Sequence, residues 1–159
     1  MYADRATPAT TVKAGVGVII VDGAGRVLLE RRRDNGLWGL VGGGVDPGES
    51  VGDAARREAL EETGLTIAIT GLVGVYSDPG QGRIVTYPDN GDSRHLVDTV
   101  VTATIVSGRI RISEESLELA FFPASGLPED TVPPARAPLS DFFAGRAAQV
   151  RYPSGSAMI

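Results

Sequence analysis

The sequence predicts an α/β protein in which a mixed β-sheet lies between helices. Runs rich in β-branched residues stand on both sides of one strongly helical segment, and a second amphipathic segment comes late in the chain. That order of elements is typical of helices packed on a sheet. Periodicity alone leaves α+β as an alternative and does not give the order of the strands.

The size of the chain indicates a single domain. At 159 residues with 42% hydrophobic content, it is long enough to bury a core of its own. Residues 1–10 are rich in Ala, Thr and Pro, and we expect a flexible tail there, a single domain over residues 11–150, and a second tail over residues 151–159.

Composition and charge exclude several classes of function. A net charge near −5 argues against a general nucleic-acid binder. The absence of cysteine excludes disulfides and thiolate metal sites, and the single histidine leaves carboxylates as the natural acid and base groups. The longest apolar run is far short of the roughly 20 residues that a membrane helix needs, so no membrane partner and a cytoplasmic location are expected.

The first elements form a predicted hairpin followed by a glycine turn. Residues 12–21 and 26–31 read as strands around Asp22-Gly23, and residues 37–41 are extended and lead into the turn Gly42–Gly44. Gly15, inside the first strand, suggests close backbone approach by a neighbouring strand or by a ligand.

The central helix has clear start and stop signals. Ser50 is a good N-cap with Asp53 three residues later, and Gly64 ends the helix. At about 100° per residue, three glutamates fall within an arc of roughly 100° beside a small apolar stripe. The glutamates are Glu58, Glu61 and Glu62, and the stripe is Val51, Ala55 and Ala59.

The rest of the chain reads as further strands and one more helix. The predicted strands cover residues 65–76, with a kink near residues 71–74, and residues 84–87, 95–106 and 117–122. A loop and a short helix are expected after Pro123, and an amphipathic helix over residues 139–148.

Carboxylates this close together repel one another unless they share protons or hold a divalent cation. All-oxygen ligands favour a hard metal, Mg²⁺ first and Mn²⁺ second. Taken alone, a segment such as REALEE is more often a solvated acidic helix face. The spacing of the residues around it decides between these interpretations.

The segment from Gly43 to Leu65 resembles the signature of the Nudix hydrolases. Its seven fixed positions are all matched, by Gly43, Glu49, Arg57, Glu58, Glu61, Glu62 and Gly64, and Ala59 and Leu65 occupy the two aliphatic positions. The resemblance implies the α/β/α sandwich of that family and hydrolysis of a phosphoanhydride bond. It is tight over these residues and looser from about Thr11 to Glu129.

The resemblance also implies roles for individual residues. Glu58 and Glu62 would bind the metal, and Glu61 would be a further ligand or the catalytic base. A carbonyl of the glycine turn, Gly42 or Gly43, would be another ligand. Arg57 would reach back to Glu49 and so hold the loop against the helix.

Residues outside the signature are less determined. The family often takes one more carboxylate from a late loop or strand, and Glu115 is favoured over Glu118, with an exposed acidic loop as the alternative. Aromatic side chains could stack on a base or sugar, or else pack in the core. The candidates are Trp38, Tyr76 and Tyr87, and His95 is more often a packing or substrate contact than a catalytic group.

Two classes of function follow. The favoured one is a Mg²⁺-dependent pyrophosphohydrolase that cleaves a nucleoside diphosphate linked to another moiety, of the ADP-ribose or nucleotide-sugar type, with (d)NTPs or oxidised nucleotides as the alternative substrates. The other is a non-catalytic nucleotide sensor of the same fold. Pro79 lies near, not at, the position associated with ADP-ribose hydrolases. The expected partner is a small nucleotide, and a homodimer is possible.

Overall fold

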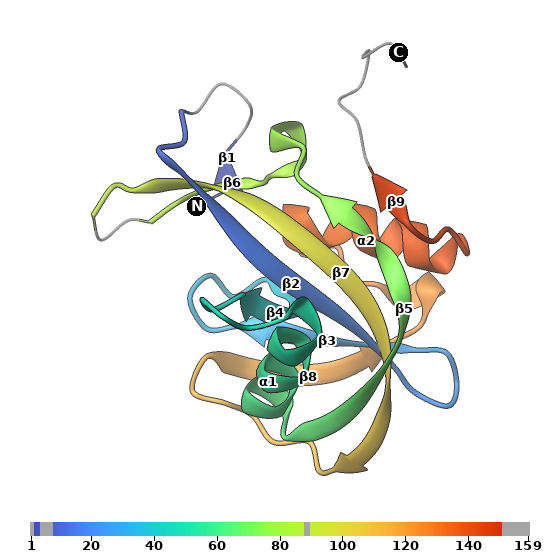
Figure 1. Cartoon of the computed structure of the whole chain (residues 1–159). Helices are drawn as coiled ribbons and strands as arrows, with labels where there is room; N and C mark the ends of the chain where they lie inside the picture. The colour runs from blue at the N-terminus through green and yellow to red at the C-terminus, as the bar shows by residue number, and fades with distance from the viewer. Residues whose placement is uncertain (1, 4–7, 88–89, 151–159) are drawn as a thin grey trace.

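The computed structural model describes residues 2–3, 8–87 and 90–150, which form a nine-stranded mixed sheet and two α-helices (Figure 1). The strands run β1-β6-β7-β2-β4-β3-β8, while β5 pairs with β7 and β9. Their bounds are β1 Tyr2–Ala3, β2 Thr11–Val21, β3 Val27–Arg32, β4 Trp38–Gly44, β5 Leu65–Tyr76, β6 Ile84–Thr86, β7 Ser93–Gly108, β8 Ser116–Phe122 and β9 Gln149–Val150. The helices are α1 Val51–Thr63 and α2 Pro133–Phe143.

The long strand β7 organises the sheet. It pairs in parallel with β2 from Thr11↔Arg94 to Val21↔Thr104, and antiparallel with β5 and β6. Strand β5 follows β7 with three register shifts: one lies within the predicted kink, between Leu72 and Gly74, and one directly before it, between Ile69 and Gly71. Residues 15–20 of β2 are all buried, as expected for a strand covered on both faces.

The two helices cover opposite faces of the sheet. Along β2, Val18 and Ile20 pack in the cluster that contains the α1 alanines, whereas Ile19 packs in the cluster that contains Leu139 of α2. Successive side chains of a strand point to opposite faces. The arrangement is therefore the predicted α/β/α sandwich, with a separate core on each side (Figure 1).

Helix α1 begins and ends where the sequence predicts. The Ser50 hydroxyl accepts a hydrogen bond from the Asp53 amide at 3.0 Å, and Gly64 adopts the left-handed conformation at φ 77°. Ala54, Ala55 and Ala59 are fully buried, because their small side chains let the helix backbone approach the sheet. This close packing places the glutamates of the same helix at the edge of the buried face.

Helix α2 differs from the prediction of residues 139–148. It begins at Pro133 and ends at Phe143, and Pro138 lies inside it. Proline suits the first turn of a helix, where the amide has no partner to lose, so Pro133 and Pro134 start the helix early. A proline inside a helix removes one backbone hydrogen bond, so Pro138 is an unusual residue at this position.

Two further expectations need correction. Gly42–Gly44 do not form a turn but end strand β4, where Gly44 pairs with Gly15 and Gly42 with Gly17. The predicted N-terminal tail includes strand β1, which pairs with β6. The predicted C-terminal tail, residues 151–159, lies outside the described residues. None of the helices in the described ranges has the length and apolar character needed to cross a membrane.

Candidate active site

A cleft of about 540 Å³ lies where β2, β4 and α1 meet. It is lined by four of the predicted carboxylates, Glu58, Glu61, Glu62 and Glu115, and by the backbone of Gly42–Gly44. The volume falls within the usual range of small-molecule sites, about 300 to 1,000 Å³. The cleft therefore brings together the three helix glutamates of the signature, its Gly43, and the late carboxylate Glu115.

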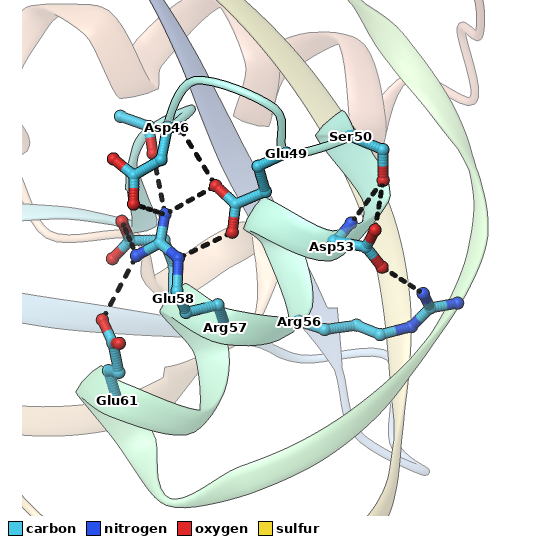
Figure 2. Close-up of polar contacts among 9 residues, drawn as sticks. Asp46, Glu49, Ser50, Asp53, Arg56, Arg57, Glu58 and Glu61 are labelled. Carbon is cyan, nitrogen blue, oxygen red and sulfur yellow. Dashed lines mark hydrogen bonds and ion pairs between the residues drawn. The ribbon is translucent and has the colours of Figure 1, made fainter.

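Arg57 is the centre of the polar network beside the cleft (Figure 2). Its Nε and Nη2 donate to the two oxygens of Glu49 at 2.7 and 3.0 Å, and Nη2 also donates to the Gly44 carbonyl at 2.9 Å. Its Nη1 donates to Glu58 at 2.9 Å and to Glu61 at 3.3 Å. One guanidinium thus links the loop before α1, the end of β4 and two helix glutamates.

The charges in this network stabilise one another. Hydrogen bonds from Arg57 lower the pKa of the Glu49 carboxyl to about 2. The same contacts raise the pKa of the Arg57 guanidinium. The bidentate pairing of Arg57 with Glu49, which the sequence predicts, holds both groups ionised.

Glu62 lies deeper than the other glutamates of the helix. Its side chain is buried, and Oε2 accepts a hydrogen bond from the Gly42 amide at 2.9 Å. Burial, together with the negative charge of nearby Glu30, raises the pKa of the Glu62 carboxyl to about 9. A positive charge at this place would favour the ionised form.

Glu58 lies directly against the end of β4. A Cβ added to Gly43 would stand 2.4 Å from Glu58 Oε1, so this close approach requires glycine. Burial raises the pKa of the Glu58 carboxyl, and the Arg57 guanidinium opposes that shift. Glycine is therefore needed at position 43 of the signature because the Glu58 carboxylate lies against its Cα.

Glu30 is a buried carboxylate that the sequence analysis missed. It is 2% exposed, accepts a hydrogen bond from the Ser116 hydroxyl, and has its pKa raised mainly by burial. With Glu115 it lines a second, adjoining hollow of about 310 Å³. A lone glutamate within the apolar run of β3 was the available signal, because charged residues are rarely buried without a role.

Four residues that the sequence predicts as substrate contacts are not among those that line the cleft. Trp38 packs edge-to-face on Phe122 in the core. Tyr76 is fully buried, with its hydroxyl donating to Asp141 at 2.8 Å. His95 Nε2 contacts the Ser77 carbonyl at 2.6 Å, and Glu118 is exposed on β8. Aromatic identity alone did not separate these core positions from Tyr87, which does line the cleft.

Other cleft residues were not predicted from sequence. Lys13 and Asp98 come from β2 and β7, and Arg83 comes from the turn before β6. Each lies outside the signature in sequence. The parallel pairing of β2 with β7 brings Lys13 near Asp98, and the antiparallel pairing of β6 with β7 brings Arg83 there. A polar residue such as Asp98 within a long apolar strand was the only available hint.

The donor set fits a hard divalent cation, although the carboxylates have other partners in this structure. Glu58 and Glu61 contact Arg57, and Glu62 contacts the Gly42 amide. Within residues 2–3, 8–87 and 90–150, no three acidic or histidine side chains already converge as a metal site. Two features of the site favour a divalent cation. All the candidate ligand atoms are oxygens, and burial raises the pKa of the Glu58 and Glu62 carboxyls, which a nearby cation would lower.

The comparison with protein families agrees with this geometry. The NUDIX domain model matches residues 11–143. The chain belongs to the Nudix hydrolase family. Members of this family generally use a divalent metal.

Individual relatives have several named activities. Over 113 residues the chain is 32% identical to an ADP-ribose pyrophosphatase of Methanocaldococcus jannaschii, covering 69% of this chain and 62% of the relative. Over 65 residues it is 49% identical to a Bacillus subtilis protein provisionally named an 8-oxo-dGTP diphosphatase, covering 41% of this chain and 44% of the relative. The chain thus spans about half the length of these curated relatives.

Solved structures confirm the fold. A MutT Nudix hydrolase from Burkholderia pseudomallei matches with a TM-score of 0.67 at 32% identity, covering 81% of this chain and 96% of that one. A Nudix hydrolase from Nitrosomonas europaea matches with a TM-score of 0.68 at 24% identity, covering 90% and 78%. The α/β/α sandwich predicted from the sequence is therefore the fold of the Nudix hydrolases.

Proposed function

We propose that the protein is a Mg²⁺-dependent pyrophosphohydrolase that cleaves a nucleoside diphosphate linked to another moiety. The observation that carries this proposal is the meeting of Glu58, Glu61 and Glu62 in one cleft, next to the Arg57–Glu49 pair. A phosphoanhydride resists attack by water because its own negative charge repels the nucleophile. An enzyme for this bond must therefore neutralise charge and orient a water molecule.

Glu58, Glu62 and Glu61 would hold the cation, with the Gly42 carbonyl as a further ligand. Bound there, Mg²⁺ would supply positive charge to the diphosphate and make a water molecule more acidic, and Mn²⁺ would substitute for it. Glu62 gains most from such a charge, because it is buried and close to another acid, Glu30.

Arg57 has a positioning role in this proposal. Its guanidinium ties Glu49 and the Gly44 carbonyl to the helix and so keeps Glu58 at the cleft. Groups that orient metal ligands commonly change metal affinity or activity by about 10 to 100 fold when removed.

Glu61 and Glu115 are the candidates for the group that takes the proton from the attacking water. Both line the cleft and both are exposed, so either carboxylate could exchange its proton with solvent. Glu115 comes from the loop before β8, where the Arg33 amide donates to its carbonyl at 2.8 Å. A base must lie within hydrogen-bond reach of the proton, directly or through one water.

The name of the Methanocaldococcus jannaschii relative supports ADP-ribose as the substrate, and the name of the Bacillus subtilis relative supports oxidised (d)NTPs as the alternative. A panel of ADP-ribose, nucleotide sugars, dinucleoside polyphosphates and (d)NTPs, assayed with Mg²⁺ and with Mn²⁺, tests the two. We expect AMP and ribose 5-phosphate from ADP-ribose. Release of pyrophosphate from a (d)NTP as the fastest reaction would favour the alternative, and no turnover of any compound would contradict both.

A further inference from the structure

The cleft contains an ion pair that the proposed hydrolysis does not use. Arg83 Nη1 donates to Asp98 Oδ2 at 2.5 Å, and the two side chains are 2% and 18% exposed. Both residues line the same cleft as the helix glutamates. A buried charge pair is costly unless its geometry is good, which raises the question of what this pair does.

Arg83 is held from three sides. Besides Asp98, its Nη2 donates to the Pro134 carbonyl at 2.6 Å, and the guanidinium lies 5.5 Å from the centre of the Tyr76 ring. The Pro134 carbonyl is available because Pro138, four residues later, has no amide hydrogen to donate to it. Arg83 is therefore a fixed donor that determines where Asp98 Oδ2 lies.

Gly15 makes room for the other oxygen of this carboxylate. Gly15 pairs directly with Asp98, and a Cβ added to it would stand 2.1 Å from Asp98 Oδ1. The glycine that looked unusual inside β2 is thus explained by the carboxylate that lies over it. Arg83 donates its hydrogen bond to Oδ2, and the charge of Lys13, which also lines the cleft, acts on the same carboxylate. Oδ1 is therefore the oxygen that could accept a hydrogen bond from a ligand.

The surroundings of Asp98 suit a flat, largely apolar group. Apolar side chains of neighbouring strands line this part of the cleft together with Tyr87. They are Leu40, Val85, Leu96 and Val100. Ligand sites commonly combine such walls with a few fixed polar groups that set orientation.

Asp98 lies beside the strand that the helix glutamates contact. Asp98 on β7 and Gly44 on β4 both pair with Gly15 on β2, from opposite sides. The Asp98 side chain leans over Gly15: a Gly15 Cβ would stand 2.1 Å from Asp98 Oδ1 and 3.3 Å from the Gly43 carbonyl oxygen, so these two oxygens lie within about 5.4 Å of each other. Val41 packs on the α1 side and Val100 on the α2 side, so alternation along the strands puts Gly43 and Glu58 on the α1 face and Asp98 on the α2 face. A nucleotide that reaches Asp98 with its base would therefore have its phosphates on the Glu58 side of β4.

We propose that Asp98 Oδ1 accepts a hydrogen bond from an exocyclic amino group of the substrate's nucleobase, so that the protein prefers adenine or cytosine nucleotides to their oxo counterparts. Hypoxanthine and uracil would turn a carbonyl oxygen toward the carboxylate and be repelled. Guanine offers two adjacent donors, which match both oxygens of a carboxylate, but Oδ2 is already taken by Arg83. This inference rests on the proposed nucleotide substrate and adds its base preference.

Asp98→Asn tests the proposal by reversing one hydrogen bond. Arg83 can only donate, so the amide oxygen must face Arg83, and the amide NH₂ then faces the cleft. We expect wild-type protein to bind AMP at least about tenfold more tightly than IMP, the scale of a hydrogen bond to a charged group. In Asp98→Asn this ratio should fall at least about tenfold.

Calorimetric titration of the four mononucleotides AMP, IMP, CMP and UMP in Mg²⁺ measures these ratios without relying on turnover. The CMP and UMP arms show whether the site takes a pyrimidine instead of a purine. The control is Glu118→Gln, the same chemical change at an exposed position outside the cleft, and its ratios should equal those of wild type.

A fifth ligand keeps the proposal testable if Asp98→Asn does not fold. Purine riboside 5′-monophosphate lacks only the amino group of AMP and should bind wild-type protein at least about tenfold more weakly. Equal binding of these two ligands, with no preference for CMP over UMP, would overturn the inference. So would a ratio unchanged by Asp98→Asn. Failure to hydrolyse any nucleotide, with the base preference intact, would instead contradict the proposed hydrolysis.

Discussion

Among single residues, Arg57 is the one that we expect to hold Glu58 and the Gly44 carbonyl in position. Its neighbour Arg56 has the same chemistry but is exposed and pairs with Asp53, away from the glutamates (Figure 2). We predict that Arg57→Ala weakens metal affinity and activity together by roughly 10 to 100 fold, because Glu58 and the Gly44 carbonyl lose their common donor. Raising the Mg²⁺ concentration should restore much of the rate.

A Mg²⁺ titration of the rate, run for wild type, Arg57→Ala and Arg56→Ala, checks this prediction. Arg56→Ala should behave as wild type. A large loss of rate in Arg57→Ala at unchanged Mg²⁺ affinity would mean that Arg57 acts on the substrate's phosphates, and its positioning role would have to be withdrawn.

The substitution Glu62→Gln removes the negative charge of the most buried helix glutamate while keeping the shape of its side chain. The amide oxygen of glutamine can still accept from the Gly42 amide, so the fold should be kept. The charge that would hold the cation is lost, and we predict that kcat falls at least about a hundredfold. The measurement is kcat at saturating Mg²⁺ beside a thermal melt, and near wild-type kcat would remove Glu62 from the metal site.

A contact could be predicted from the sequence only where the two residues lie close together along the chain. The resemblance implies the pairing of Arg57 with Glu49, which one helix and the loop before it hold close together. Glu30 and Asp98 have partners more than ten residues away, Ser116 and Arg83, and only strand pairing brings them together. No local pattern predicts such contacts.

At the scale of elements, the end of β4 decides how closely the helix carboxylates approach the sheet. Gly43 touches Glu58, whereas Gly23 in the first hairpin has open space around its Cα. We predict that Gly43→Ala lowers activity about a hundredfold, the loss that a displacement near 1 Å can cause, because its Cβ must push the Glu58 carboxylate away.

Gly23→Ala is the matched control and should leave activity unchanged, since its Cβ would meet no atom within 4 Å. Comparing kcat/KM of the two variants, with circular dichroism to check folding, makes the test. Equal kcat/KM of Gly43→Ala and Gly23→Ala would show that the contact between Gly43 and Glu58 does not affect activity.

The limits of prediction for whole elements have a physical cause. Capping residues act locally, so Ser50 and Gly64 mark the ends of α1 correctly. In α2, Pro138 has no amide hydrogen and so leaves the Pro134 carbonyl without a partner inside the helix. Arg83, from another part of the chain, donates a hydrogen bond to that carbonyl. A hydrogen bond between residues this far apart along the chain cannot be predicted from a local sequence pattern.

At the scale of the whole molecule, the sandwich could be predicted but its strand order could not. The buried side chains of β2 and β3 alternate between the core under α1 and the core under α2. The parallel pairing of β2 with β7, however, joins segments about 80 residues apart and has no local signature. That pairing puts Asp98 in the same cleft as the helix glutamates.

We propose that this Nudix protein hydrolyses a nucleotide phosphoanhydride through a cation held by the α1 glutamates. The initial rate of ADP-ribose hydrolysis by the wild-type protein, first in excess EDTA and then as Mg²⁺ is added back, tests this proposal. We predict no turnover in EDTA and a recovery that saturates with Mg²⁺. Full turnover in excess EDTA would contradict it.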